Sequence, residues 1–322
     1  MAAPRPRIFA LLLCVSFFLF WDQLSTAPLN QRPIIGVLAQ ETSRSFQKFG
    51  SSFVAASYVK YLESAGARVV PISINLTEAQ YRKLFYSING LLLPGGGTNL
   101  ITSQFAKIAA LFYDLALQAN DHGSYFPVWG TCLGFEELTV LTSGEKLLIA
   151  TNTSNLPLPL KFTQDAMDSR MFKNFPRDLM QALAVEPLTA NFHYWSISVK
   201  NFTRNTKLRN FYKILTTNMD NKKLVFVSTM EARNYPIYGV QWHPEKSAFE
   251  WTKKKNIPHS LDAVEVSWYL AEFFVNEARK NWHHFSDETE EANALIYKYP
   301  QVYTANISVY EQIYVIDGNR FS

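Results

Sequence analysis

The stretch Phe126-Pro-Val-Trp-Gly130-Thr-Cys132-Leu-Gly134-Phe-Glu136 decides the fold of this chain. It begins as a short apolar run typical of a buried strand and continues, from about Phe135, with a helical pattern. A strand, a glycine-flanked turn and a helix in this order form a nucleophile elbow, a sharp turn that holds its central residue in strained dihedral angles. We therefore expect Cys132 at the carboxyl edge of a sheet, where a helix N-terminus favours its thiolate. A buried, inert cysteine is the alternative.

Strand-like and helix-like segments alternate around this turn. Short apolar runs predict strands at 33–40, 68–74, 90–93, 126–129, 224–228 and 237–241, and helical spacing predicts helices at 53–63, 104–118 and 263–278. Thr77-Glu-Ala-Gln80 predicts a capping box at the start of a further helix. The alternation predicts an α/β fold with a mostly parallel sheet covered by helices on both faces. Beyond Gly144 it loosens, which indicates extra loops, and 302–310 predicts an exposed strand or ordered tail as a C-terminal extension.

Residues 1–27 have the pattern of a cleaved secretory signal peptide. Two arginines precede an apolar run at 8–21, which is shorter than the roughly 18 residues that a bilayer span needs, and small residues follow it. An uncleaved anchor is the alternative. We expect the mature chain, 28–322, to be a single catalytic domain. Because Cys14 lies in the signal, that domain would carry one cysteine and no internal disulfide.

Four glycosylation sequons support a secretory route. They lie at Asn75, Asn152, Asn201 and Asn306. The formal net charge of +4 is small and its basic residues are scattered, so we expect no nucleic-acid partner. No segment after the signal is apolar and long enough to span a bilayer, so we expect no membrane partner for the mature chain.

A thiol nucleophile needs a base, and His243 in Tyr238-Gly-Val-Gln-Trp-His243-Pro-Glu245 is the strongest candidate. It follows a predicted strand, so its side chain can reach the same sheet edge, and Glu245 can orient the imidazole. A surface His-Pro turn is the alternative. His193 lies among aromatic residues and is either a substrate-binding residue or a packed core histidine. No histidine has metal-ligand spacing, so we expect neither a metal site nor a cofactor.

The glycine triplet Gly95-Gly-Gly97 follows the strand predicted at 90–93. Such a turn presents free backbone N–H groups, and Gly95, Gly96 and Gly97 together with the N–H of Leu133 can hold the oxyanion of a tetrahedral intermediate. A phosphate cradle is the alternative, but the triplet lacks the Lys-Ser/Thr of a P-loop and the spacing of a dinucleotide fingerprint.

Together these three motifs resemble the class I glutamine amidotransferases, in which a Cys-His-Glu triad hydrolyses a γ-carboxamide. One position departs from that pattern. The family usually has Gln four residues after the nucleophile, where it contacts the substrate, whereas this chain has Glu136. We expect Glu136 to bind the substrate or to orient the histidine. An ordinary acidic residue at a helix N-terminus is the alternative.

A closer resemblance, to the γ-glutamyl hydrolase family, extends over nearly all of 33–317. It rests on the stretches 58–71, 126–138, 184–193 and 269–280. The resemblance implies hydrolysis of γ-glutamyl bonds in folate and antifolate poly-γ-glutamates, which are small-molecule substrates, through a thioester on Cys132. It also implies a homodimer located in the lysosome lumen or secreted. A glutaminase subunit and a non-catalytic secreted binding protein on the same fold remain as alternatives.

Overall fold

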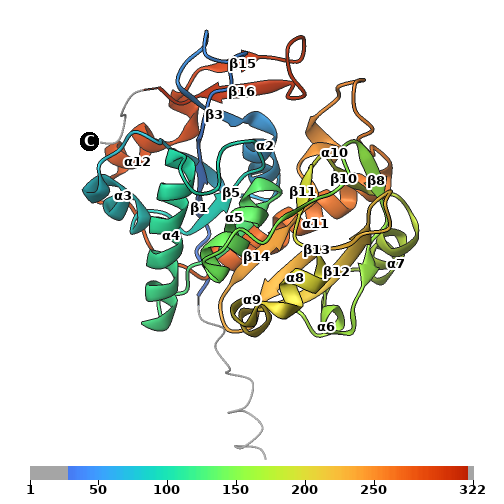
Figure 1. Cartoon of the computed structure of the whole chain (residues 1–322). Helices are drawn as coiled ribbons and strands as arrows, with labels where there is room; N and C mark the ends of the chain where they lie inside the picture. The colour runs from blue at the N-terminus through green and yellow to red at the C-terminus, as the bar shows by residue number, and fades with distance from the viewer. Residues whose placement is uncertain (1–27, 318–322) are drawn as a thin grey trace, which may run out of the picture.

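The computed structural model describes residues 28–317 and contains a central eight-stranded sheet (Figure 1). Across the sheet the strands are β4 (Arg68–Ile72), β1 (Ile34–Leu38), β5 (Gly90–Leu93), β6 (Val128–Thr131), β14 (Ile237–Val240), β13 (Val225–Ala232), β12 (Tyr212–Met219) and β9 (Lys161–Phe162). The first five are parallel and the last three antiparallel. The mostly parallel sheet predicted from the sequence is confirmed, whereas the predicted signal segment, 1–27, lies outside the described residues.

Helices cover both faces of this sheet, as predicted. They are α2 (Ala56–Ser64), α3 (Glu78–Phe85), α4 (Gln104–Asp121), α5 (Leu133–Ser143), α6 (Gln164–Met167), α7 (Arg177–Val185), α8 (Val199–Arg204), α9 (Thr206–Phe211), α10 (Lys246–Phe249), α11 (Leu261–Ala278) and α12 (Glu288–Ala294), with a 3₁₀ turn at Ile296–Lys298. The capping box of Thr77 and Gln80 is present at the start of α3. Apolar residues of all these elements form one continuous core.

Strand alternation decides which helix covers which face. Trp129 and Tyr238 point toward α11, where Trp129 contacts Phe274 and Tyr238 contacts Phe273. The next residues along the two strands point the opposite way because side chains alternate along a strand. One of them is Gly239, whose missing β-carbon leaves room for Phe135 of α5. Glycine on one face and aromatics on the other therefore let α5 approach the sheet more closely than α11 does.

The C-terminal extension is a hairpin rather than a single strand or tail. β15 (Gln301–Tyr303) and β16 (Gln312–Val315) pair with each other, and β16 pairs with β3 (Ser52–Ala55), which also pairs with β2 (Gln40–Glu41). This small sheet lies at the top of Figure 1. The helix expected from residue 53 therefore starts only at Ala56. A small apolar cluster that includes Phe53 and Ile313 holds the C-terminal hairpin against β3.

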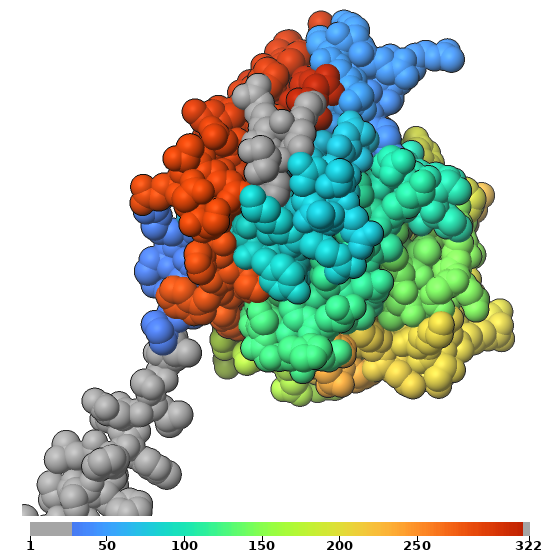
Figure 2. Space-filling model, turned by 90° about the vertical axis from the view of Figure 1, so that its left-hand side faces the viewer, coloured from blue at the N-terminus to red at the C-terminus, as the bar shows by residue number. Residues whose placement is uncertain are grey.

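Two further pairs of short strands complete the region after Gly144. β10 (Thr189–Asn191) pairs with β8 (Leu156–Leu158), and β11 (Trp195–Ser196) pairs with β7 (Ile149–Ala150). On another face, the C-terminal segment packs side by side with early segments (Figure 2). There Lys83 of α3 forms an ion pair of 2.5 Å with Glu290 of α12. Among residues 28–317 no helix has the length and hydropathy to cross a membrane.

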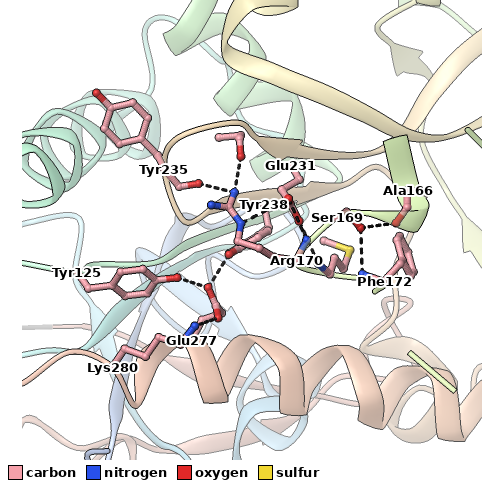
Figure 3. A network of polar contacts seen from close by, with 12 residues as sticks. Tyr125, Ala166, Ser169, Arg170, Phe172, Glu231, Tyr235, Tyr238, Glu277 and Lys280 are labelled. Atoms are coloured by element: carbon pink, nitrogen blue, oxygen red, sulfur yellow. Dashed lines mark hydrogen bonds and ion pairs between the residues drawn. The ribbon is translucent and has the colours of Figure 1, made fainter. Parts of the chain in front are cut away.

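A buried polar network ties α11 to the amino edge of the sheet (Figure 3). Glu277 of α11 accepts hydrogen bonds from the hydroxyls of Tyr238, at 2.5 Å, and Tyr125. Arg170 lies over the ring of Tyr238, 5.3 Å from its centroid, and pairs with Glu231 of β13 at 3.4 Å. Because these groups lie at the edge opposite the carboxyl ends of β5, β6 and β14, they stabilise the sheet without entering the candidate site.

Candidate active site

The elbow positions Cys132 at the carboxyl end of β6, as the sequence predicts. Its backbone has φ 50° and ψ −103°, and its N–H donates to the carbonyl of Val240 on β14 at 2.8 Å. A β-carbon at Gly134 would lie 2.0 Å from the carbonyl oxygen of Leu93, so only glycine lets the first turn of α5 pass this close to β5. The strained cysteine is therefore enforced by contacts with both neighbouring strands.

His243 and Glu245 lie beside this cysteine. Nδ1 of His243 is 2.8 Å from Oε1 of Glu245, and both side chains are buried. A β-carbon added at Gly95 would lie 2.6 Å from His243 Cε1 and 3.2 Å from the β-carbon of Cys132. The glycine loop, the cysteine and the histidine thus converge at one point, above the adjacent ends of β5, β6 and β14. Glu245, rather than Glu136, is the carboxylate that contacts the imidazole.

Burial sets the protonation of these groups. It raises the pKa of the Cys132 thiol well above its ordinary value, and the carboxylates of Glu136 and Glu245 act in the same direction. Burial also lowers the pKa of His243 despite the nearby Glu245. Although burial opposes it, His243 and Lys246 hold the pKa of Glu245 below its ordinary value. Burial of the sulfur thus opposes the thiolate that the helix N-terminus is expected to favour.

The predicted oxyanion donors differ in availability. The N–H of Gly95 already donates to the hydroxyl of Tyr58, at 2.7 Å, and that hydroxyl lies 3.4 Å from Nδ1 of His243. The N–H of Leu133 is directed at the Cys132 sulfur and lowers its pKa slightly. Within 28–317 the N–H groups of Gly96 and Gly97 have no hydrogen-bond partner. Among these residues the structure thus leaves the N–H groups of Gly96 and Gly97 free, directs that of Leu133 at the sulfur and engages that of Gly95 with Tyr58.

Tyr58 and Gln40 were not found from the sequence. Tyr58 lies on α2, and Gln40, on β2, donates from Nε2 to the carbonyl of Gly95 at 2.7 Å. Neither belongs to a motif, and only the packing of β2, β3 and α2 beside the glycine loop brings them to the site. The signal available in the sequence was a tyrosine in an apolar helical stretch, which equally fits a core residue.

Cys132 lies where two cavities meet. The apolar arm has a volume of about 560 Å³, and its walls include Phe46, Phe53, Phe192, Ile257, Tyr310, Lys246 and Lys255. The polar arm has a volume of about 520 Å³, and its walls include Glu136, Lys146, His193 and Trp195. Gly96 and Gly97 border both arms. A substrate lying along both arms would present an internal bond to the thiol.

Glu136 and His193 both border the polar arm. Oε1 of Glu136 accepts a hydrogen bond from Nε2 of Gln241 at 3.1 Å, and burial raises the pKa of this carboxyl to about 8. His193 is 3% exposed, its Nδ1 lies 2.9 Å from the hydroxyl of Thr153, and its Nε2 lies 3.1 Å from Oδ1 of Asn191. Burial lowers its pKa to about 3. The substrate role predicted for His193 stays a prediction. Its contacts with Thr153 and Asn191 favour the other interpretation, in which His193 holds the wall of the polar arm in place.

Lys246 is a further charged group of the site that the sequence motifs did not reveal. Its side chain is 3% exposed and borders the apolar arm. Nζ lies 3.7 Å from Oε1 of Glu245 and 4.7 Å from the ring centroid of Tyr310, but it has no hydrogen-bond partner in the described part of the chain. Although burial opposes it, Glu245 raises the pKa of this ammonium group. A buried cation thus faces the arm with its hydrogen bonds unmade.

The four predicted glycosylation sites lie in different surroundings. Asn75, Asn152 and Asn306 are exposed, whereas Asn201 is half-buried and its Nδ2 donates to the carbonyl of Leu147 at 2.9 Å. Among residues 28–317 no three His, Cys, Asp or Glu side chains gather as a metal-ligand set.

Comparison with known proteins identifies the family. The profile of the Peptidase C26 family matches residues 33–245. The human gamma-glutamyl hydrolase is 58% identical over 288 residues, which cover 89% of this chain and 90% of that protein. The gamma-glutamyl hydrolase B of Dictyostelium discoideum is 42% identical over 90% of this chain and 84% of that protein.

The structural comparison supports the fold. The glutaminase domain of a Trypanosoma brucei CTPS with bound acivicin superposes with a TM-score of 0.51, although it is only 14% identical, over 78% of this chain and 96% of that domain. This likeness confirms the class I glutamine amidotransferase-like fold expected from the sequence. The chain belongs to the Peptidase C26 family and is, within it, an enzyme of the γ-glutamyl hydrolases that cleaves γ-glutamyl bonds.

Proposed function

We propose that the enzyme hydrolyses folate and antifolate poly-γ-glutamates through a thioester on Cys132. The observation that carries the proposal is the convergence of Cys132 and His243 on Gly95, with Glu245 2.8 Å behind the imidazole. This is the arrangement of nucleophile, base and orienting carboxylate that acyl transfer requires. The two arms that meet at the thiol suit a long substrate cut at an internal amide.

The contacts of His243 define its tautomer. Because Nδ1 faces the ionised Glu245, its proton is donated to that carboxylate, and Nε2 is left as the base. Cys132 and His243 then start as a neutral pair, and the thiol proton moves to Nε2 as the sulfur attacks the γ-carbonyl carbon. The imidazolium gives this proton to the departing amine of the next glutamate. A water molecule, deprotonated by Nε2, then attacks the thioester and releases the γ-carboxylate and the thiol.

The tetrahedral oxyanion is held by backbone groups. In the described part of the chain the N–H groups of Gly96 and Gly97 are the free donors, and that of Leu133 joins them once the sulfur has become part of the tetrahedral intermediate. Each such donor contributes about 10²- to 10³-fold to kcat in related acyl-transfer sites. The N–H of Gly95 can join them only if the Tyr58 hydroxyl gives up its 2.7 Å hydrogen bond. Tyr58 therefore holds the loop in place rather than contributing a donor of its own.

Charge and apolar surface support the choice of substrate. Lys246 offers a buried ammonium group to a carboxylate of the glutamyl chain. Glu136, with its pKa near 8, is protonated at acidic pH and can donate a hydrogen bond to the glutamyl unit in the polar arm. The aromatic walls of the apolar arm fit a flat heteroaromatic group.

We also propose that the protein follows the secretory route to the lysosome lumen or the exterior, carries N-glycans and forms a homodimer. Exposed Asn75, Asn152 and Asn306 support the glycans. Exposed tryptophans at 251, 268 and 282 provide apolar surface for a second copy. Chromatography with light scattering tests the dimer, and fractionation of cells tests the location.

The test of the mechanism is Cys132→Ala, offered a folyl-γ-glutamate of defined length and, separately, glutamine. We expect wild-type enzyme to cleave the first in preference to the second and the variant to cleave neither. Rapid acid quench followed by mass spectrometry should find the acyl group on Cys132 in wild-type enzyme. Cleavage by the variant would refute the thioester, and preferential glutamine hydrolysis would favour a glutaminase subunit instead.

A further inference from the structure

We propose that Lys253, Lys254 and Lys255 form a carboxylate-binding rim at the mouth of the apolar arm, which draws in and holds those units of a polyanionic γ-glutamyl chain that lie between the heteroaromatic group and the scissile bond. These residues lie in the loop between α10 and α11, above α10 in Figure 1. The inference deepens the proposed function, because it concerns how the same site selects long substrates.

The loop is joined to the cleft at a defined point. Lys255 borders the apolar arm, and its Nζ lies 5.7 Å from the ring centroid of Phe192. Nζ of Lys246 lies 5.8 Å from the centroid of the same ring. The ring of Phe192 thus lies beside two ammonium groups, that of the buried Lys246 and that of Lys255 on the rim. A ligand passing Phe192 meets positive charge at both levels.

Contacts on either side of the lysines fix the loop. The N–H of Asn256 donates to Oδ1 of Asn155 at 2.6 Å, and Ile257 is 8% exposed and forms part of the arm's wall. On the other side, the loop follows α10, which begins one residue after Glu245. The rim is therefore held between a wall of the cleft and the catalytic segment.

The charge of the rim is unbalanced within the protein. Lys253 and Lys254 are exposed and Lys255 is half-buried, and no carboxylate of residues 28–317 lies within ion-pair distance of any of the three. The acidic residue of the same arm is Glu41, whose Oε1 already accepts the N–H of Gln104. A run of lysines is ordinarily a solvated surface. This one continues inward to Lys246, whose buried ammonium group has no hydrogen-bond partner within the described part of the chain.

The chemistry of a γ-linked chain matches this arrangement. Each unit joined through its γ-carboxyl group keeps a free α-carboxyl group, so the chain carries one negative charge per unit. With a pKa of roughly 3.5 these carboxyl groups stay ionised at pH 5 as well as at pH 7. Flexible ammonium groups suit such a ligand because they act as point charges without a fixed geometry. Clustered charge at a cleft mouth also raises the association rate, in a manner that salt suppresses.

The test compares the triple variant Lys253→Gln, Lys254→Gln, Lys255→Gln with wild type on folyl substrates that carry one, three or five γ-glutamyl units. At low ionic strength we expect kcat/KM of wild type to rise with chain length. We expect the variant to lose about tenfold on the longest substrate and progressively less on shorter ones. Raising the salt to about 0.5 M should bring wild type close to the variant. The triple Lys→Arg variant, which keeps the charge, should retain the chain-length dependence.

A matched control removes the same charge elsewhere. Lys107, Lys200 and Lys207 are exposed on α4, α8 and α9 and border neither arm. Their triple Gln variant should keep the wild-type dependence on chain length. The rim is refuted if its Gln variant shows the same dependence as wild type, or if the control variant loses as much. These outcomes are independent of the thioester, which Cys132→Ala tests separately.

Discussion

The Oε1 atom of Glu245 lies 2.8 Å from Nδ1 of His243, and the Glu136 carboxylate instead accepts a hydrogen bond from Gln241 at 3.1 Å. The two buried acids thus have separate partners. One orients the imidazole beside the nucleophile, and the other borders the arm that receives the substrate. This division determines how their substitution should affect the reaction.

Glu245→Gln should lower kcat strongly, because the amide cannot hold the imidazole in its tautomer or stabilise its charged form. We expect a loss of about 10²- to 10⁴-fold, with KM changed little. Glu136→Gln should act mainly on KM, since Glu136 does not contact the histidine. Steady-state kinetics on one defined γ-glutamyl substrate distinguish the two. Equal effects on kcat would contradict the assignment.

Gly95→Ala should abolish turnover while Gly97→Ala is tolerated. The new β-carbon at Gly95 would lie 2.6 Å from Cε1 of His243 and 2.7 Å from the Tyr58 hydroxyl, whereas no atom lies within 4 Å of a β-carbon at Gly97. We expect more than about 100-fold loss of kcat/KM for the first change, because small displacements of catalytic groups are costly. Circular dichroism should show both variants folded. A fully active Gly95→Ala enzyme would contradict the geometry.

Glu137→Gln should stabilise the protein at neutral pH. Both carboxylate oxygens of Glu137 are buried and have no hydrogen-bond partner among residues 28–317, and burial together with Glu136 raises the pKa of this carboxyl group to about 8. Since the folded pKa exceeds the unfolded value, the folded state retains a proton that the unfolded state releases. Stability therefore falls as pH rises from about 4.5 to about 8.

The Glu137→Gln variant should lose part of this dependence of stability on pH. We expect a gain on the order of 2 kcal/mol in unfolding free energy at pH 8 and little change at pH 4.5. Urea denaturation at the two pH values measures it. The same gain at both values would show that titration of Glu137 is not the cause.

Glu277→Gln should destabilise the fold and leave catalysis unchanged. Its carboxylate accepts hydrogen bonds from Tyr125 and Tyr238 at the sheet edge far from Cys132. Both tyrosines donate to Oε2, whereas Oε1 accepts from Lys280, so an amide whose oxygen keeps the tyrosines turns its NH₂ group toward the Lys280 ammonium, and we expect a loss of about 1–3 kcal/mol. Glu265→Gln, on the exposed side of the same helix, is the matched control and should be neutral. Thermal unfolding tests the loss of stability, and kcat tests whether catalysis is unchanged. A drop in kcat would contradict the prediction.

Asn201 should be the sequon without a glycan. Its amide is half-buried and donates to the Leu147 carbonyl, whereas Asn75, Asn152 and Asn306 face solvent. Site-resolved mass spectrometry of protein from a secreting cell line measures occupancy. Full occupancy at Asn201 would contradict this prediction and show that the hydrogen bond to Leu147 does not prevent glycosylation.

The sequence predicted best what depends on local pattern. The buried runs at 33–40 and 90–93, the capping box at Thr77 and the turn at Cys132 are each set by neighbouring residues, and the structure has them. The spacing of apolar residues at 53–63 predicts that Phe53 lies in a helix. It lies in β3 because β16, some 260 positions later, supplies its hydrogen-bond partners.

Features that depend on tertiary packing were not predictable in this way. The contact of Tyr58 with the Gly95 N–H joins a helix to a distant loop, and the buried position of Lys246 depends on Tyr310 from the C-terminal hairpin. The burial that raises the pKa of Cys132 also depends on tertiary packing. A motif shows the favourable helix dipole but not how much water the surrounding chain removes from the sulfur.

The hairpin of β15 and β16 also bears on the order of events during synthesis. Its connecting loop supplies Ile307 and Tyr310 to the wall of the apolar arm, and β16 pairs with the strand that leads into the helix carrying Tyr58. A ribosome therefore has to translate beyond Tyr310 before the cleft is complete. A nascent chain that already contains the cysteine, the histidine and the glutamate still lacks a wall of its substrate site, so we expect activity to begin only after this hairpin has been synthesised.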